Sequence, residues 1–284
     1  MLFTVEKSLC VWYNMHMIDL KRKKLFLLDM DGTLYLDDKL FDGAAELLET
    51  IKKKGGRYVF LTNNSSKGAA SYVEKMNSLG INSSEDDFLT SVDALSAFLR
   101  KKYGKAANKR KIYIMGTRSF RQQMKSEGFT ITNELEDNIE LLVIGFDREL
   151  TFSKLEDACI LLGRGVDYLA TNPDWVCPTS YGFVPDCGSF AFMLEKATGR
   201  KPHFIGKPQP DMALLAMEKF GYSKEETIII GDRLYTDIAC GNNAGIDAAF
   251  VLSGEGTVSD INDGSAKPDG IYKGVWEILE EIDK

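Results

Sequence analysis

Residues 25–33 read LFLLDMDGT, four apolar side chains followed by two aspartates, separated by one methionine, and a glycine. A short apolar run that ends in polar and turn-forming residues is typical of a strand buried in a parallel sheet. Ligands of such sheets bind beyond the carboxyl ends of the strands, which is where Asp29 and Asp31 fall. Paired short carboxylates suit a hard cation such as Mg2+, and Gly32 lets main-chain N–H groups turn toward an anion. Taken alone, these residues are also explained by a polar β-turn after a strand.

A second acidic cluster, GDRLYTD at residues 231–237, also follows an apolar run, residues 227–230. Asp232 stands at the end of that predicted strand, so its carboxylate is expected at the same edge of the sheet as the first pair. Asp237 and Thr236 have a simpler explanation, because either side chain could cap a helix predicted to begin at Thr236.

Two further segments supply donors for an anion. LTNNSS follows a third apolar run, and its Thr62, Asn63 and Asn64 offer hydroxyl and amide groups before a predicted helix N-terminus, where an anion is stabilised. An ordinary helix cap would explain the same residues. A Gly-Lys-Pro sequence contributes Lys207; lysines are usually exposed, so this residue gains significance only from the other three motifs.

Apolar runs alternate with amphipathic helices along the chain, which predicts an α/β fold with a doubly wound, Rossmann-like parallel sheet. Thr62 follows Asp29 by 33 residues, enough for a single crossover, whereas Lys207 follows Thr62 by 145 residues. A crossover or two uses about 40 residues, so roughly 100 remain for an inserted α/β domain. The predicted parts are an N-terminal extension at 1–20, a discontinuous core domain at 21–103 and 203–284, and a cap domain at 104–202.

Composition excludes several classes of protein. The chain has 35 Lys and Arg against 42 Asp and Glu, a net charge of −7, so a nucleic-acid partner is not expected. No apolar run approaches the ~18 residues of a membrane span. Five cysteines without a CxxC pair predict reduced thiols and a cytoplasmic protein. Two histidines make a His-rich zinc site or a histidine-based triad improbable.

In their order along the chain, the four motifs resemble those of the haloacid dehalogenase superfamily of phosphatases. LTNNSS, the large insertion, GKPQP and GDRLYTDI together are similar to its NagD-type branch, which includes 4-nitrophenylphosphatases. The resemblance covers the chain from about residue 24 to the C-terminus. It implies a Mg2+-dependent hydrolase of small phosphomonoesters such as sugar phosphates or nucleotides, with 4-nitrophenyl phosphate as an artificial substrate. By analogy, a homodimer formed through the cap is expected.

The resemblance also implies roles for the motif residues. Asp29 would attack phosphorus to form an aspartyl-phosphate, and Asp31 would act first as general acid and then as general base. Asp29, the main-chain carbonyl of Asp31 and Asp232 would hold Mg2+. Asp237 would hold metal-bound water or the lysine. The residues expected to bind the phosphate are Thr62, Asn63, Asn64 and Lys207.

Substrate choice is expected to depend on the cap, because something must cover the leaving group. The candidate segment is the loop at residues 172–188, in which Trp175, Tyr181, Phe183 and Asp186 are the candidate specificity residues. Packing inside the cap explains the three aromatic residues equally well. Relatives often carry small residues where this chain has Asp186, so their substrates do not transfer to it.

Competing functions differ in their spacing requirements. A P-loop NTPase is excluded because Lys207 is followed by Pro208 instead of Ser or Thr. A non-catalytic phosphate-ligand-binding protein and a phospho-acceptor signalling protein remain as alternatives. Mg2+-dependent release of phosphate separates an enzyme from both.

Overall fold

The structure is a computed structural model that describes residues 18–179, 181–264 and 266–284. Of the extension predicted over residues 1–20, only the last three positions belong to this part of the chain, and the others lie outside the described residues. The chain divides into two compact units, residues 1–60 with 217–284, and residues 61–216.

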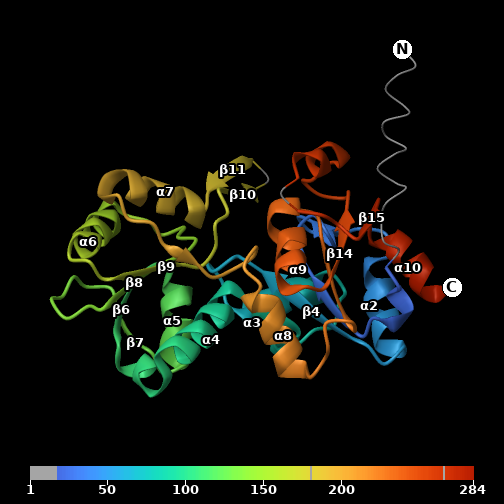
Figure 1. The fold of residues 1–284 in the computed structure, drawn as a ribbon, viewed down its shortest axis with the longest axis horizontal. Helices are drawn as coiled ribbons and strands as arrows, with labels where there is room; N and C mark the ends of the chain where they lie inside the picture. The colour runs from blue at the N-terminus through green and yellow to red at the C-terminus, as the bar shows by residue number, and fades with distance from the viewer. Residues whose placement is uncertain (1–17, 180, 265) are drawn as a thin grey trace, which may run out of the picture. The chain divides into compact units, whose positions relative to one another are not determined.

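One sheet has six strands in the order β15-β14-β13-β1-β4-β5 (Figure 1). Their bounds are β1 Leu25–Leu28, β4 Arg57–Thr62, β5 Phe88–Thr90, β13 Thr227–Gly231, β14 Asp247–Val251 and β15 Gly270–Tyr272. β1 pairs in parallel with both β13 and β4, with Leu28 opposite Ile230 and Phe60. The chain runs outward from β1 through β4 to β5, and from β13 through β14 to β15, so the winding reverses between β1 and β13. In doubly wound sheets, ligands bind at this reversal.

Amphipathic helices pack on the first unit. α2 (Ala44–Lys53) lies beside α10 (Val275–Asp283), and α9 (Ala239–Ala244) packs against β14 (Figure 1). α2 buries Ala44, Leu47, Leu48 and Ile51, which recur at i, i+3, i+4 and i+7 and so share one helix face. Burial of each large apolar side chain contributes roughly 1.5–3 kcal/mol. The smaller elements are η1 Leu20–Arg22, the hairpin strands β2 Tyr35–Leu36 and β3 Lys39–Leu40, and η5 Val258–Asp263.

The second unit contains a five-stranded sheet in the order β12-β9-β8-β6-β7, whose pairs are all parallel. The strands are β6 Lys111–Met115, β7 Thr130–Thr132, β8 Leu141–Ile144, β9 Asp167–Ala170 and β12 His203–Phe204. α5 (Arg118–Ser126) lies on one face, and α6 (Phe152–Gly163) and α7 (Cys187–Thr198) lie on the other (Figure 1). The core between this sheet, α6 and α7 is built from Leu142, Ile144, Leu161, Phe190 and Leu194 with their neighbours.

The second unit contains further elements. They are α3 Ala69–Ser78, η2 Glu85–Asp87, α4 Ser91–Tyr103, η3 Gly104–Lys109 and the antiparallel hairpin of β10 Val176–Thr179 with β11 Gly182–Pro185. α8 (Asp211–Phe220) begins in this unit and ends in the other.

The predicted α/β fold with parallel sheets is confirmed, and the structure corrects two local predictions. Residues 172–188, expected to be a loop, contain the hairpin β10–β11, whose alternation is interrupted by Pro178. The helix expected from Thr236 begins two residues earlier, as the π-helix η4 (Leu234–Ile238). Strand β12 pairs with β9, so residues 203 and 204 belong to the second sheet. The domain limits at 21–103, 104–202 and 203–284 stay a prediction.

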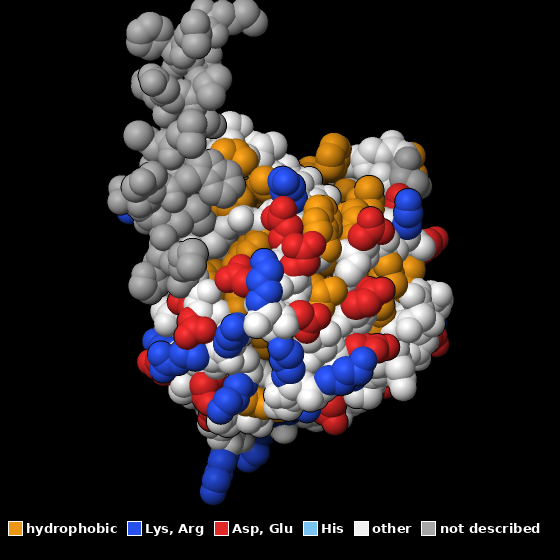
Figure 2. Space-filling model, turned by 90° about the vertical axis from the view of Figure 1, so that its right-hand side faces the viewer, with side chains coloured by type: hydrophobic (Ala, Val, Ile, Leu, Met, Phe, Trp, Pro, Cys, Tyr) orange, Lys and Arg blue, Asp and Glu red, His pale blue; other side chains and the backbone are white. Residues whose placement is uncertain are grey.

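The surface drawn in Figure 2 mixes acidic and basic side chains, with apolar ones between them. The helices that the structure describes are all too short or too polar to cross a lipid bilayer.

Candidate active site

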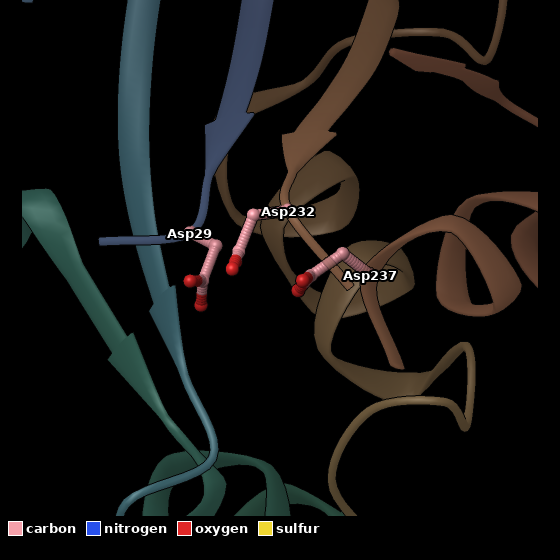
Figure 3. A group of neighbouring side chains, drawn as sticks. All are labelled: Asp29, Asp232 and Asp237. Atoms are coloured by element: carbon pink, nitrogen blue, oxygen red, sulfur yellow. The ribbon is translucent and has the colours of Figure 1, made fainter. Parts of the chain in front are cut away.

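Three aspartates of the first unit converge where the winding of the sheet reverses. One carboxylate oxygen from each of Asp29, Asp232 and Asp237 lies within 4.8 Å of the other two, and Figure 3 shows the three side chains directed toward a common space. Asp29 directly follows β1, and its N–H donates to Ile230 O at 2.9 Å, which continues the pairing with β13. Asp232 directly follows β13. Asp232 and Asp237 are buried and Asp29 is partly buried.

Glycines allow the backbone to approach these carboxylates. A Cβ atom on Gly32, whose φ is +85°, would lie 2.4 Å from Asp232 Oδ2, and one on Gly254 would lie 1.9 Å from the same oxygen. A Cβ atom on Gly231 would lie 2.3 Å from the Cβ of Asp237. Larger residues at these three positions would displace the acidic side chains, so the glycines are part of the site.

Hydrogen bonds fix the orientation of Asp232. Its Oδ2 accepts the Glu255 N–H at 2.7 Å, and its main-chain carbonyl accepts the Gly256 N–H at 3.1 Å. Thr33 Oγ1 lies 3.5 Å from Asp232 Oδ1. Donation from main-chain N–H groups stabilises the charged form of a buried carboxyl group.

Asp237 lies inside η4, and its Oδ2 accepts the Arg233 N–H at 3.2 Å. The residue at the cap position is Arg233, which makes no side-chain capping bond. The alternative that Thr236 or Asp237 caps a helix is therefore wrong. π-Helical turns are rare in proteins as a whole, but those that occur are often at functional sites. This one places the Asp237 carboxylate beside those of Asp29 and Asp232.

Asp31 lies on the turn after β1, and its carboxylate is not a member of the three-aspartate cluster. Its side chain is exposed and lies 3.5 Å from the Tyr35 hydroxyl, and the Gly32 N–H donates to Tyr35 O at 2.9 Å. An exposed carboxyl group near the cluster suits exchange of a proton with a ligand or water.

The three-aspartate cluster fits a divalent metal ion. Its donors are carboxylate oxygens, the ligands that Mg2+ prefers, and the glycine-lined cradle leaves them close together. Like charges at this separation repel one another unless a cation compensates them. The residues that would hold the ion are Asp29, Asp232 and Asp237.

The LTNNSS segment forms a tight turn in the second unit. Thr62 is the last residue of β4, and its Oγ1 accepts the Asn64 N–H at 3.1 Å. Asn64 Oδ1 accepts the N–H and the hydroxyl of Ser66, at 2.9 and 2.7 Å. α3 begins at Ala69, and its N-cap residue is Gly68, which has no side chain to cap the helix. The helix-cap alternative is wrong, because the N-cap residue of α3 is Gly68, whereas a helix does follow the segment as predicted.

Asn63 and Lys207 are buried neighbours in the same unit. Asn63 Nδ2 donates to Lys207 O at 2.9 Å and to both oxygens of Asp174 at 3.2 Å. Lys207 is 3% exposed, and its ammonium donates to Leu61 O at 3.2 Å. Lys207 is therefore not an ordinary surface lysine.

The candidate specificity residues divide into two kinds. Trp175, Tyr181 and Phe183 are 55%, 75% and 70% exposed on or beside the β10–β11 hairpin. Trp175 also packs edge-on against Phe192, so packing inside the cap explains part of Trp175 but neither Tyr181 nor Phe183. Asp186 is buried, and its carboxylate caps α7 by accepting the Cys187 N–H. Their roles toward a substrate stay predictions.

Sequence reasoning assigned no role to Asp174, which the structure places beside Asn63. Its signal in the sequence was an Asn-Pro-Asp triplet just after an apolar strand, the same position relative to a strand as that of the acidic motifs.

Comparisons with known proteins agree with this geometry. Residues 26–130 match a family model described as haloacid dehalogenase-like hydrolase, and residues 204–278 match one described as HAD-hydrolase-like. An acid sugar phosphatase from Staphylococcus aureus is 30% identical over 265 residues, which cover 93% of this chain and 100% of that protein.

Two solved structures are similar over nearly the whole chain. A 4-nitrophenylphosphatase from Thermotoga maritima is 42% identical with a TM-score of 0.86, covering 93% of this chain and 98% of that one. A glycerol phosphate phosphatase from Mycobacterium tuberculosis, in complex with magnesium, is 28% identical with a TM-score of 0.82, covering 89% and 75%.

Proposed function

This chain belongs to the haloacid dehalogenase-like hydrolases, in the branch of the 4-nitrophenylphosphatases, and we propose that it is a Mg2+-dependent phosphatase of small phosphorylated metabolites. The observation that carries the proposal is the convergence of Asp29, Asp232 and Asp237 at the winding reversal, with Asp29 directly at the end of β1.

The proposed reaction uses two carboxylates in sequence. Asp29 attacks phosphorus, so that a bond forms between its oxygen and phosphorus while the bond from phosphorus to the leaving oxygen breaks. Asp31 gives its proton to the leaving oxygen. It then takes a proton from water, which attacks the aspartyl-phosphate and releases inorganic phosphate and free Asp29. The exposure of Asp31 and its position outside the cluster support this role.

Asp29, Asp232 and Asp237 would hold Mg2+, which would supply positive charge to the phosphate oxygens. The predicted contribution of the Asp31 main-chain carbonyl to this set remains part of the proposal. Glu255 N–H and Gly32 keep the Asp232 carboxylate in one orientation, so little rearrangement is needed when the ion binds.

The proposed phosphate-binding groups are the Thr62 hydroxyl, the main-chain N–H of Asn63 and the Lys207 ammonium. Asn64, whose N–H donates to Thr62 Oγ1, would contribute by holding the turn. Asn63 is assigned through its main chain because its side-chain N–H groups already donate to Asp174 and Lys207. Lys207 is buried, which strengthens its attraction to an anion compared with a solvated lysine.

The proposed substrates are small phosphomonoesters, because the similar proteins are named for sugar phosphates, glycerol phosphate and 4-nitrophenyl phosphate. We propose that Trp175, Tyr181 and Phe183 contact the leaving group, since their exposed rings offer apolar surface that the core of the second unit does not use. Exchanging the hairpin for another sequence should then change substrate preference but not metal dependence. Asp186 would act only by holding the start of α7, and a homodimer through residues 104–202 stays a prediction.

The test is phosphate release from 4-nitrophenyl phosphate and a panel of phosphomonoesters, with Mg2+ and with EDTA. Asp29→Asn should lose turnover while keeping its fold. Asp38→Asn, the same change at an exposed turn residue nine positions on, should keep full activity. Substantial activity in purified Asp29→Asn protein would refute the nucleophile assignment. No release from any ester by the unaltered protein would favour the non-catalytic alternatives.

A further inference from the structure

A buried carboxylate of the second unit is bonded to the turn that the proposed function assigns to phosphate. Asp174 is 5% exposed and lies four residues beyond β9. Its N–H donates to Asn172 Oδ1 at 3.0 Å, and its main-chain carbonyl accepts the Gly188 N–H at 2.8 Å. Its backbone is therefore fixed on both sides, and the side chain is held against Asn63.

Asn63 is held at both ends. Its main-chain carbonyl accepts the Ser91 hydroxyl at 2.7 Å and Asn172 Nδ2 at 2.9 Å. Its side-chain nitrogen donates to Asp174 and to Lys207 O. Asn63 Oδ1 has no hydrogen-bond partner among the residues that the structure describes. The amide orientation is thus selected by its two acceptors alone.

We propose that Asp174 is a positioning residue for phosphate chemistry: its carboxylate orients the Asn63 amide, which in turn holds the main chain of Lys207 and the turn at residues 62–64. The inference rests on the proposed function. A carboxylate is an acceptor only, so it admits one orientation of the Asn63 amide, with the nitrogen toward Asp174 and Lys207 O. The reverse orientation would place Asn63 Oδ1 against two acceptors.

Close packing makes the link between Asn63 and Lys207 stiff. A Cβ atom on Gly206, the residue before Lys207, would lie 2.5 Å from Asn63 Oδ1 and 2.6 Å from Thr171 O. Asn63 therefore lies directly against the backbone that carries Lys207. A reoriented Asn63 side chain would press on that backbone and so displace the Lys207 that it carries.

The variant that tests the inference is Asp174→Asn. It keeps the shape of the side chain but replaces one acceptor oxygen with an N–H donor, so that only Lys207 O still requires the present orientation of the Asn63 amide. We expect kcat/KM for 4-nitrophenyl phosphate to fall at least tenfold and inhibition by inorganic phosphate to weaken at least tenfold. The Mg2+ concentration for half-maximal activity should stay within twofold, because the three-aspartate cluster is not altered.

A double-mutant cycle with Asn63→Ala tests whether Asp174 acts through Asn63. In the Asn63→Ala background, Asp174→Asn should change kcat/KM by less than twofold, because the side chain that it orients is gone. The matched control is Asp147→Asn, the same change at a carboxylate that is 2% exposed and bonded to Lys154 at 2.7 Å. It should lower stability and leave kcat/KM unchanged.

Each outcome decides the inference. Additive effects in the cycle, or an Asp174→Asn protein within twofold of the unaltered one, would overturn it while the proposed function stands. An inactive unaltered protein would remove the proposed function and the inference together. If Asp174→Asn does not fold, Gly206→Ala disturbs Asn63 from its other side, and unchanged phosphate inhibition in that variant would overturn the inference.

Discussion

Replacing Asp237 with asparagine is expected to stabilise the metal-free protein and to weaken its response to Mg2+. The cluster contains three close pairs of carboxylates, and Asp237 belongs to two of them, one with Asp29 and one with Asp232. The oxygens of each pair lie within 4.8 Å of each other. Two unit charges 4.8 Å apart repel by about 0.9 kcal/mol in a medium as polar as water and by about 3.5 kcal/mol at an effective dielectric constant of 20. Loss of both pairs therefore removes about 2 to 7 kcal/mol of repulsion.

The expected net gain is about 2 kcal/mol, at the lower end of that range, because hydrogen bonds and other charges already offset part of the repulsion. Asparagine retains an oxygen that can accept the Arg233 N–H, so the shape of η4 is preserved. Mg2+ should stabilise the unaltered protein by binding its folded form, and should stabilise Asp237→Asn much less.

The assay is urea unfolding in EDTA and in saturating Mg2+, followed by circular dichroism. Asp147→Asn serves as the control, since it breaks an attractive pair with Lys154 and should be destabilised under both conditions. An Asp237→Asn protein that is less stable than the unaltered one in EDTA, with an intact response to Mg2+, would refute the reasoning.

Two further predictions follow from single residues. Gly32→Ala should lower phosphate release at least a hundredfold with the fold retained, because φ is +85° and the new Cβ would lie 2.4 Å from Asp232 Oδ2; a Mg2+ titration that matches the unaltered protein would contradict this. Burial raises the pKa of the Cys187 thiol to about 12, so the folded protein keeps this proton to higher pH than the unfolded chain does. Stability should be unaffected by this group below pH ~9 and should then fall by about 1.4 kcal/mol per pH unit up to about 12. Cys187→Ala should remove this fall in the free energy of unfolding at alkaline pH. A pH profile identical to that of the unaltered protein would exclude the thiol as the source of the fall.

Local patterns were sufficient to predict the buried strands β1, β4 and β13 and the alternation of strands with amphipathic helices, but not the short edge strand β15. The apolar residues of α2 recur at helical spacing, which predicts a helix with one buried face. β1 is a continuous apolar run, which predicts a strand buried on both faces. The hairpin at residues 176–185 was missed because Pro178 interrupts its alternation, and hairpins on an exposed surface have weak apolar patterns.

The acidic motifs were predictable as a group because all of them follow strands. The alternative that LTNNSS caps a helix was wrong, because its side chains hold a turn: Thr62 Oγ1 accepts the Asn64 N–H, and Asn64 Oδ1 accepts the Ser66 N–H. Such local bonds compete with helix formation, and α3 begins after them, at Ala69.

The sequence by itself determined the order of strands and helices and the placement of carboxylates at strand ends, because these depend on the periodicity of nearby residues. Only the tertiary structure decided which side chains meet. β1 and β13 become neighbours through the reversal of winding, which brings Asp232 to Asp29 although about 200 residues separate them. A π-helical turn adds Asp237 and leaves the Asp31 carboxylate outside. Asp174 reaches Asn63 across 111 residues. Contacts of this kind depend on close backbone approach at glycines and on the direction of individual side chains, which local periodicity does not encode.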